Sequence, residues 1–220
     1  MGEYYQLSGE ETLRALKTNV NGLTQDEAHA RLQQYGPNTI QLEKKINILQ
    51  LLIGQFTELL VLVLIGAGIL SYLVGDSLDT IAIFAIVLVN GLLGFFQEYK
   101  AERAIEALKK LGAQKATVKR NGQLFQIDAS ELVPGDIVQL EEGDKIPADI
   151  RFIETIETAV DEAILTGESN ASNKTIEAFS QNLAVADRKN YGYANTSIVR
   201  GRGIGVVIST GLHTEFGKIA

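Results

Sequence analysis

Two long apolar segments constrain this chain more than any other feature of its sequence. From Ile46 to Gly75 the only charged residue is Glu58, and from Thr80 to Gln97 there is none. Each segment is long enough to cross a bilayer, since a membrane-spanning helix needs about 20 apolar residues. The alternative, two buried helices of a soluble protein, is disfavoured because the remaining sequence is too poor in apolar residues to cover them. We therefore expect two transmembrane helices, at 46–75 and within 78–112.

Basic residues predict the orientation of this hairpin. They lie before the first segment and after the second, whereas the connecting "GDSLD" has none. By the positive-inside rule, both flanks and both termini are expected to be cytoplasmic in an integral membrane protein. The basic residues concerned are Arg14, Lys17, Arg31, Lys44, Lys45, Lys100, Arg103, Lys109, Lys110 and Lys115.

The second apolar segment is expected to continue as a cytoplasmic stalk. The stretch "QEYKAERAIEALKKLGA" keeps helical spacing, with Glu106 four residues before Lys110. Gly112 is expected to end this helix. An amphipathic helix lying on the membrane surface is the alternative.

Residues 1–45 are predicted to form a small helical arm. Ser8 with Glu11, and Thr24 with Glu27, have the spacing of capping boxes at helix starts. Gly36 is expected to end the second helix. The apolar faces of two such short helices cannot form a core alone, so we expect the arm to pack on another domain.

Residues 113–220 are predicted to form that domain, and it should be mainly β. The stretch "KATVKRNGQLFQI" indicates a hairpin with Asn121 and Gly122 at its turn. Further short apolar runs alternate with turn residues, and a helix is expected only at "NASNKTIEAFSQ". The chain has no cysteine, which excludes disulfides and thiolate metal sites, and its net charge of −7 argues against binding nucleic acid.

Four stretches in order carry a family resemblance: "NGLLGFFQEYKAERAIEALKKL", "VPGDIVQLEEGDKIPADIRFIE", "DEAILTGES" and "RGIGVVISTGLHTEFGKIA". In order and spacing they resemble the front end of P-type cation-transporting ATPases of type II, the calcium-pump and sodium-pump relatives. The resemblance covers essentially the whole chain. It implies an α+β membrane protein fragment: the helical arm, a two-helix transmembrane hairpin, and a cytoplasmic actuator domain with a distorted jelly-roll fold.

The resemblance also gives a role to "TGES". In the family this loop hydrolyses an aspartyl phosphate held on a separate domain. By resemblance Glu168 is the catalytic carboxylate that orients and deprotonates water, while Thr166, Gly167 and Ser169 shape the loop. A general base must come within hydrogen-bond reach of the water, and a glycine lets the backbone approach a phosphorylated surface closely. The alternative is a surface turn with a solvated carboxylate.

The sequence departs from the family pattern in two ways. After "TGES" the family usually has apolar residues before a lysine, whereas "NASN" precedes Lys174 here, which predicts a loop held less firmly. The phosphorylated "DKTGT" motif is also absent. ATP and Mg²⁺ are expected cofactors of a full-length pump, but no cofactor is expected for this chain alone, and it should not be catalytically competent by itself.

Glu58 is the second carboxylate of interest. An acidic residue within a membrane segment indicates function, and in calcium-pump relatives one at this place helps to gate cation entry. A residue with its head in water at the interface is the alternative. Two functions remain open. The chain is the front of an ATP-driven cation pump, with lipid, the transported cation and the remaining pump segments as partners, or it is a non-catalytic membrane-anchored module from a truncated or split gene.

Overall fold

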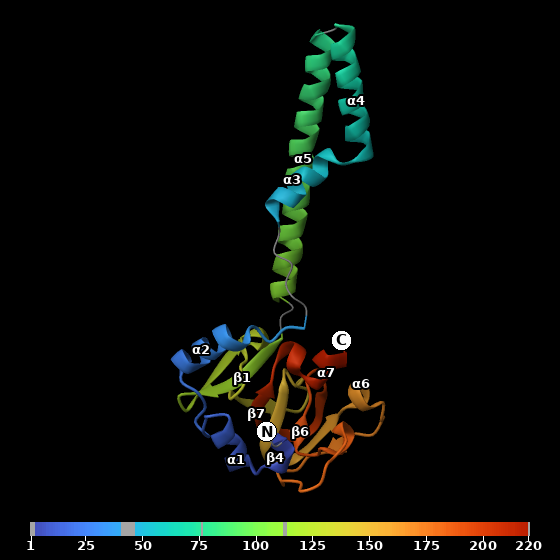
Figure 1. Ribbon diagram of the computed structural model, residues 1–220. Helices are drawn as coiled ribbons and strands as arrows, with labels where there is room; N and C mark the ends of the chain where they lie inside the picture. The colour runs from blue at the N-terminus through green and yellow to red at the C-terminus, as the bar shows by residue number, and fades with distance from the viewer. Residues whose placement is uncertain (1–2, 41–46, 76, 112–113, 220) are drawn as a thin grey trace. The chain divides into compact units, whose positions relative to one another are not determined.

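The computed structural model describes residues 3–40, 47–75, 77–111 and 114–219 (Figure 1). The chain forms two compact units. One unit, here called the β domain, comprises residues 1–42 and 113–220, and the other, the helical unit, comprises residues 43–112. The predicted helical arm and β-rich segment therefore belong to one unit, as expected from the arm's small apolar faces.

The β domain is built on an antiparallel sheet, which confirms the predicted mainly β segment. Its strand order is β2-β1-β3-β7-β4-β5, and β6 pairs with β4. The strands are β1 (Lys115–Arg120), β2 (Gln123–Asp128), β3 (Ile137–Glu141), β4 (Asp149–Asp161), β5 (Ser172–Asn173), β6 (Tyr191–Gly192) and β7 (Ser197–Ser209).

The first hairpin has the predicted turn. Lys115 to Arg120 of β1 pair in continuous register with Gln123 to Asp128 of β2. Asn121 and Gly122 both have positive φ, 50° and 75°. Both central residues of a two-residue turn of this kind need positive φ, so the turn chemistry and the register agree.

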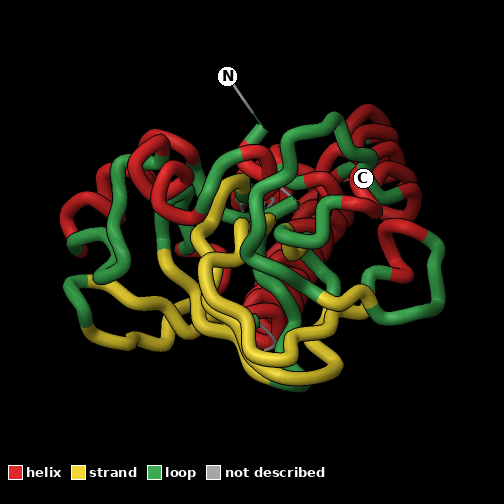
Figure 2. The backbone as a smooth tube through the Cα atoms, turned by 90° about the horizontal axis from the view of Figure 1, so that it is seen from below, coloured by secondary structure: helices red, strands yellow, loops and turns green. Residues whose placement is uncertain are grey.

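The sheet curves strongly, as the tube in Figure 2 shows. The register between β4 and β7 shifts at several points along their length, and such irregularities increase local twist. Gly201 of β7 has φ +72°, and a side chain there would collide with the carbonyl oxygens of Ile156 and Glu157. Glycine is therefore required where β7 bends against β4.

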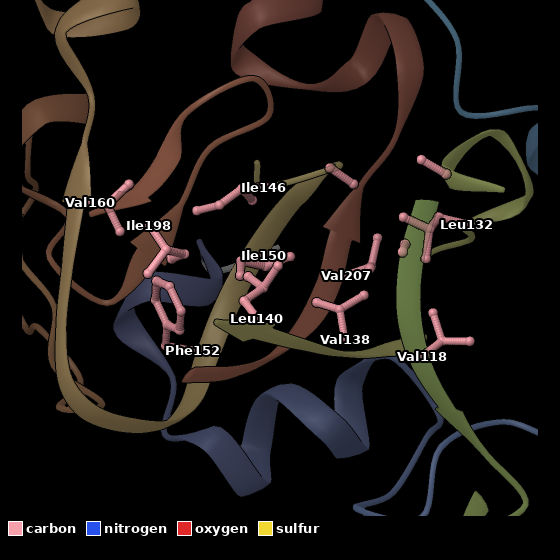
Figure 3. Close-up of a cluster of buried hydrophobic side chains, with 13 residues drawn as sticks. Val118, Leu132, Val138, Leu140, Ile146, Ile150, Phe152, Val160, Ile198 and Val207 are labelled. Atoms are coloured by element: carbon pink, nitrogen blue, oxygen red, sulfur yellow. The ribbon is translucent and has the colours of Figure 1, made fainter. Parts of the chain in front are cut away.

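One core cluster fills one face of this curved sheet. Figure 3 shows side chains from β1, β3, β4 and β7 converging, among them Val118, Leu140, Phe152 and Val207. These four side chains are at most 4% exposed. The burial of large aliphatic and aromatic groups supplies most of the driving force for folding such a sheet.

The helical arm packs on the β domain as predicted. Its helices are α1 (Gly9–Ala15) and α2 (Gln25–Tyr35), and both begin with complete capping boxes. Gly36 ends α2 with φ +76°. Leu13 and Leu16 of the α1 region join a second core cluster with Tyr191 and Val206.

A buried arginine ties the arm to the sheet. Arg151 of β4 donates hydrogen bonds to the carbonyl oxygens of Leu7 (2.9 Å) and Ile176 (3.0 Å), among others. Burial lowers its pKa to about 10. The guanidinium thus joins three stretches that are distant in sequence, because its donors fan out in fixed directions.

The helical unit differs from the expected hairpin of two straight helices. The segment 46–75, predicted as one transmembrane helix, is divided into α3 (Ile48–Phe56) and α4 (Leu59–Val74), which are bent by 59°. Thr57 donates its hydroxyl to the carbonyl of Gly54, and Glu58 is extended at the N-cap of α4. The helix therefore ends and restarts at Thr57 and Glu58.

The second helix is continuous. Helix α5 (Ser77–Leu111) covers both the second apolar segment and the predicted stalk. Its stretch Ser77–Ile105 is apolar and long enough to cross a membrane. In the most apolar part of this stretch, 11% is buried within the structure. Among the described residues it is the one such helix, or one of two if α3 and α4 form a single bent span. Gly112, predicted as its end, lies outside the described residues.

Small residues allow α5 to approach its neighbours within the helical unit. A side chain at Gly91 would meet the ring of Phe56, and one at Gly94 would meet Gln55. Gln55 also donates a hydrogen bond to Glu98 (2.6 Å). Close approach at glycine with an interhelical hydrogen bond is typical of helix packing in membranes.

The short helix expected at "NASNKTIEAFSQ" was a wrong prediction. Residues 170–181 contain strand β5 followed by irregular chain. The backbone there is held by other segments, since Lys174 N donates to Thr158 O (2.8 Å) and Phe179 N donates to Tyr5 O (3.0 Å). These bonds compete successfully with a weak local helix preference.

Candidate catalytic loop

The predicted catalytic sequence lies at the tip of a hairpin of the β domain. Strand β4 leads into the one-turn helix α6 (Ala163–Thr166), and β5 returns against β4. Gly167 ends α6 in the left-handed conformation, with φ +75°. This conformation, which glycine adopts without strain, turns the chain directly after Thr166.

Glu168 is exposed at this tip. Its backbone N–H donates to the hydroxyl of Thr166 (3.2 Å), and that hydroxyl donates to the carbonyl of Glu162 (3.1 Å). Gly167 and Ser169 are also exposed, whereas Thr166 is half-buried. Thr166 therefore organises the backbone of the turn, and the Glu168 carboxylate stays accessible to another molecule or domain.

A buried ion pair lies at the base of the hairpin. The ammonium of Lys174 donates to the Glu162 carboxylate at 2.6 Å, and their side chains are 1% and 4% exposed. Burial raises the pKa of Glu162 and lowers that of Lys174, and each partner's charge opposes the shift of the other. The Lys174 Nζ also lies 6.0 Å from the centre of the Tyr193 ring.

The surface beside the base is hollowed. A shallow hollow of about 440 Å³ is lined by Glu157, Thr158, Asn173, Lys174 and Arg200. Arg200 donates to the side chain of Asn173 (2.9 Å) and to the Glu157 carbonyl (3.3 Å). Arg200 of β7 thus adds a further contact to β5, the returning leg of the hairpin.

The other predicted site residue, Glu58, belongs to the helical unit. It occupies the break between α3 and α4, where its carbonyl accepts from Leu62 N (2.9 Å), and its side chain is exposed. Within the described ranges, no group of three or more His, Cys, Asp or Glu side chains is arranged to hold a metal ion.

The sequence indicates the exposed turn at Glu168 but does not indicate Glu162. Lys174 stands out in the sequence only as the lysine that follows "NASN", and nothing in that pattern indicates its partner. A glutamate at the end of an apolar strand, twelve positions before a lysine, is the signal that could have suggested the pair. The looser loop expected from "NASN" is exposed at its tip, yet its base is held by this pair and by β5.

Comparison with known proteins matches both parts of the chain. The family profile described as the P-type ATPase actuator domain covers residues 110–220, just over half of the chain. The profile described as the N-terminus of cation transporters and ATPases covers residues 4–71.

Whole-chain relatives agree with these matches. A calcium-transporting ATPase of Bacillus subtilis is 40% identical over 99% of this chain and 25% of its own length. A calcium-transporting ATPase of Saccharomyces cerevisiae is 38% identical over 99% of this chain and 24% of its own. A sodium/potassium exporting P-type ATPase of Schizosaccharomyces pombe is 38% identical, over 91% and 20%.

The chain thus spans about a quarter of the length of the curated relatives it matches. The matched parts are the arm with the first apolar segment and the β domain that carries the loop. This chain belongs to the P-type ATPase family, of which it carries the N-terminal region and the actuator domain.

Proposed function

We propose that this chain acts as the front end of an ATP-driven cation pump, in which Glu168 promotes hydrolysis of an aspartyl phosphate on another domain. The observation that carries the proposal is the exposed Glu168 carboxylate at the tip of a hairpin whose base is fixed. Membership of the P-type ATPase family supports it.

The chemistry assigned to the loop is general base catalysis. Glu168 accepts a proton from water as the water attacks phosphorus, which requires hydrogen-bond reach between the carboxylate and the water. The Thr166 hydroxyl fixes the amide of Glu168. Gly167 and Ser169 present no bulky side chain, so the turn can approach a phosphorylated surface closely. ATP and Mg²⁺ would serve the segments that form the phosphoenzyme.

The helical unit would anchor the pump in the lipid bilayer. Helix α5 is one span and α3 with α4 the other, and the basic flanks favour cytoplasmic termini. Glu58 would assist cation entry at the break between α3 and α4. The names of the relatives make calcium the first cation to test and sodium or potassium the next.

The decay of the phosphoenzyme tests the role of Glu168. Residues 1–220 would be joined in frame to the remaining segments of the Bacillus subtilis relative, and the product labelled with radioactive ATP. We expect Glu168→Gln to form phosphoenzyme normally and to lose it at least about 100-fold more slowly, the usual contribution of a general base. Glu177→Gln is the matched control, since Glu177 is also exposed and follows the loop.

Two results would contradict the proposal. Equal decay in Glu168→Gln and in the unmodified chimera removes the catalytic role. Failure of the chimera to form phosphoenzyme, while the parent pump forms it, favours the second function, a non-catalytic membrane-anchored module that docks on a partner.

A further inference from the structure

We propose that Glu162 and Lys174 are positioning residues, because their buried ion pair clasps the base of the loop hairpin and fixes how Glu168 is presented. The inference rests on the proposed function of Glu168. It assigns a role in catalysis to two side chains that themselves stay buried away from the reacting atoms.

The backbone alone gives the base of this hairpin little support. The pairing between β4 and β5 consists of Ala159 with Asn173 and Val160 with Ser172. One further bond joins Lys174 N to Thr158 O (2.8 Å). Such short strand pairs are marginal without side-chain contacts, so the side chains at the base decide whether the two legs stay together.

The ion pair supplies a buried contact across the base, in addition to the exposed bond from Arg200 to Asn173. Glu162 follows β4 and Lys174 follows β5, so the 2.6 Å bond joins the outgoing leg to the returning leg. Both side chains are buried, and removing one partner of such a pair leaves an uncompensated charge. Leu165 packs against the second core cluster and anchors α6.

A short chain of hydrogen bonds connects the clasp to Glu168. The carbonyl of Glu162 accepts from the N–H groups of Leu165 and Thr166, both at 2.9 Å, and from the Thr166 hydroxyl at 3.1 Å. That hydroxyl accepts from the N–H of Glu168 at 3.2 Å. A shift of Glu162 is therefore transmitted to the backbone of Glu168 through one turn of helix.

Hydrogen exchange on the chain in detergent tests the clasp without any pump activity. In Glu162→Gln, and separately in Lys174→Met, we expect the amides of residues 163–174 to exchange at least about tenfold faster, as for local opening of one structural unit. Exchange in β3 and β7 should be unchanged. Glu154→Gln is the control, because Glu154 is an exposed carboxylate on β4.

Two exchange patterns would overturn the proposal. Unchanged exchange at 163–174 means that the pair does not hold the hairpin. Equal acceleration in β3 and β7 means that the pair supports the whole fold rather than the loop.

A disulfide provides a rescue that a general loss of stability would not permit. The chain has no cysteine, so Ala159→Cys with Asn173→Cys can be added to Glu162→Gln without competing thiols. Facing residues on paired strands have a suitable spacing. When the disulfide is formed by oxidation, the amides of residues 163–174 should again exchange slowly, and reduction should make them exchange fast. Fast exchange in the oxidised protein would refute the clasp.

Phosphoenzyme decay in the chimera then separates this inference from the function on which it rests. We expect Glu162→Gln to leave phosphoenzyme formation intact and to slow decay about tenfold or more, because misplacing a catalytic group is costly. Slow decay in Glu168→Gln with normal decay in Glu162→Gln would refute the positioning role alone. Normal decay in both would refute the proposed function.

Discussion

Two buried ion pairs of the β domain hold their charges in different ways. Asp136 accepts two hydrogen bonds from Arg120, at 2.9 and 2.8 Å, and a third from Val133 N at 3.0 Å. Glu162 accepts one 2.6 Å bond from Lys174, and the side chain of Ser172 also hydrogen-bonds to it. The first pair joins the end of β1 to the residue before β3, here called the frame of the sheet, and the second lies at the base of the candidate catalytic loop.

The chemistry of the two cations explains what this difference means. Arginine stays charged and its planar fork fixes the carboxylate in one orientation, whereas a buried lysine shifts its pKa readily. Accordingly, burial lowers the pKa of Lys174. Two hydrogen bonds between Arg120 and Asp136 fix the orientation of one partner against the other, whereas the one bond between Lys174 and Glu162 leaves their relative orientation less restricted.

The largest loss of stability should follow from breaking the pair of Arg120 and Asp136. Asp136→Asn leaves the Arg120 charge buried beside a neutral side chain, and we expect a loss of about 3–5 kcal/mol in the free energy of unfolding. Urea denaturation of the chain in detergent, followed by circular dichroism, measures it. A loss below about 1 kcal/mol, the range of surface ion pairs, would show that this pair is not effectively buried.

Asp149 extends the comparison to a buried carboxylate that is held by backbone groups. It accepts from Ala194 N (2.9 Å) and Glu215 N (2.7 Å), with the charges of Glu215 and Lys218 nearby. Burial raises its pKa from the ordinary 3.8 to about 6. Since the folded state holds the proton more tightly, the associated stability is present below pH 4 and is lost as the pH rises through 6.

The size of this pH effect follows from the shift. A change of about two pKa units corresponds to about 3 kcal/mol between pH 4 and pH 7. Asp149→Asn removes this dependence on pH. The wild-type chain should lose unfolding free energy relative to the variant as the pH rises from 4 to 7. Parallel pH profiles for the two proteins would show that Asp149 does not titrate in this range.

Local features of the fold could be predicted from sequence. The turn at Asn121 and Gly122 and the capping boxes at Ser8 and Thr24 depend on neighbouring residues, and the structure confirms them. The contiguous motif at Glu168 falls on an exposed turn, and the catalytic role of Glu168 stays a prediction. The turn and the capping boxes could be predicted because every participating group lies within a few positions.

Features that join distant segments could not be predicted. The Arg151 bonds to Leu7 and Ile176, and the partnership of Glu162 with Lys174, depend on how β4 meets other parts of the chain. The break at Glu58 was missed for a different reason. Hydropathy reports that a segment is apolar, and it does not report where the segment bends.

A double substitution sharpens the comparison at the loop. The double variant Glu162→Gln with Lys174→Met replaces both buried charges by neutral side chains. Neither charge is then left buried without its partner. We expect the unfolding free energy of this variant to lie within about 1 kcal/mol of wild type, because exchanging a buried pair for neutral groups is often neutral. Urea denaturation should place Glu162→Gln alone below the double variant, and the reverse order would contradict this.

The smallest effect should come from a pair that is fully in solvent. Arg14 and Glu10 are 3.4 Å apart on α1, with side chains 79% and 84% exposed. Glu10→Gln should not shift the denaturation midpoint measurably, because exposed pairs are screened by water and salt. A shift comparable to that of Asp136→Asn would mean that burial does not set how much these ion pairs stabilise the fold. The difference between the Arg120–Asp136 pair and the Glu162–Lys174 pair would then need another cause.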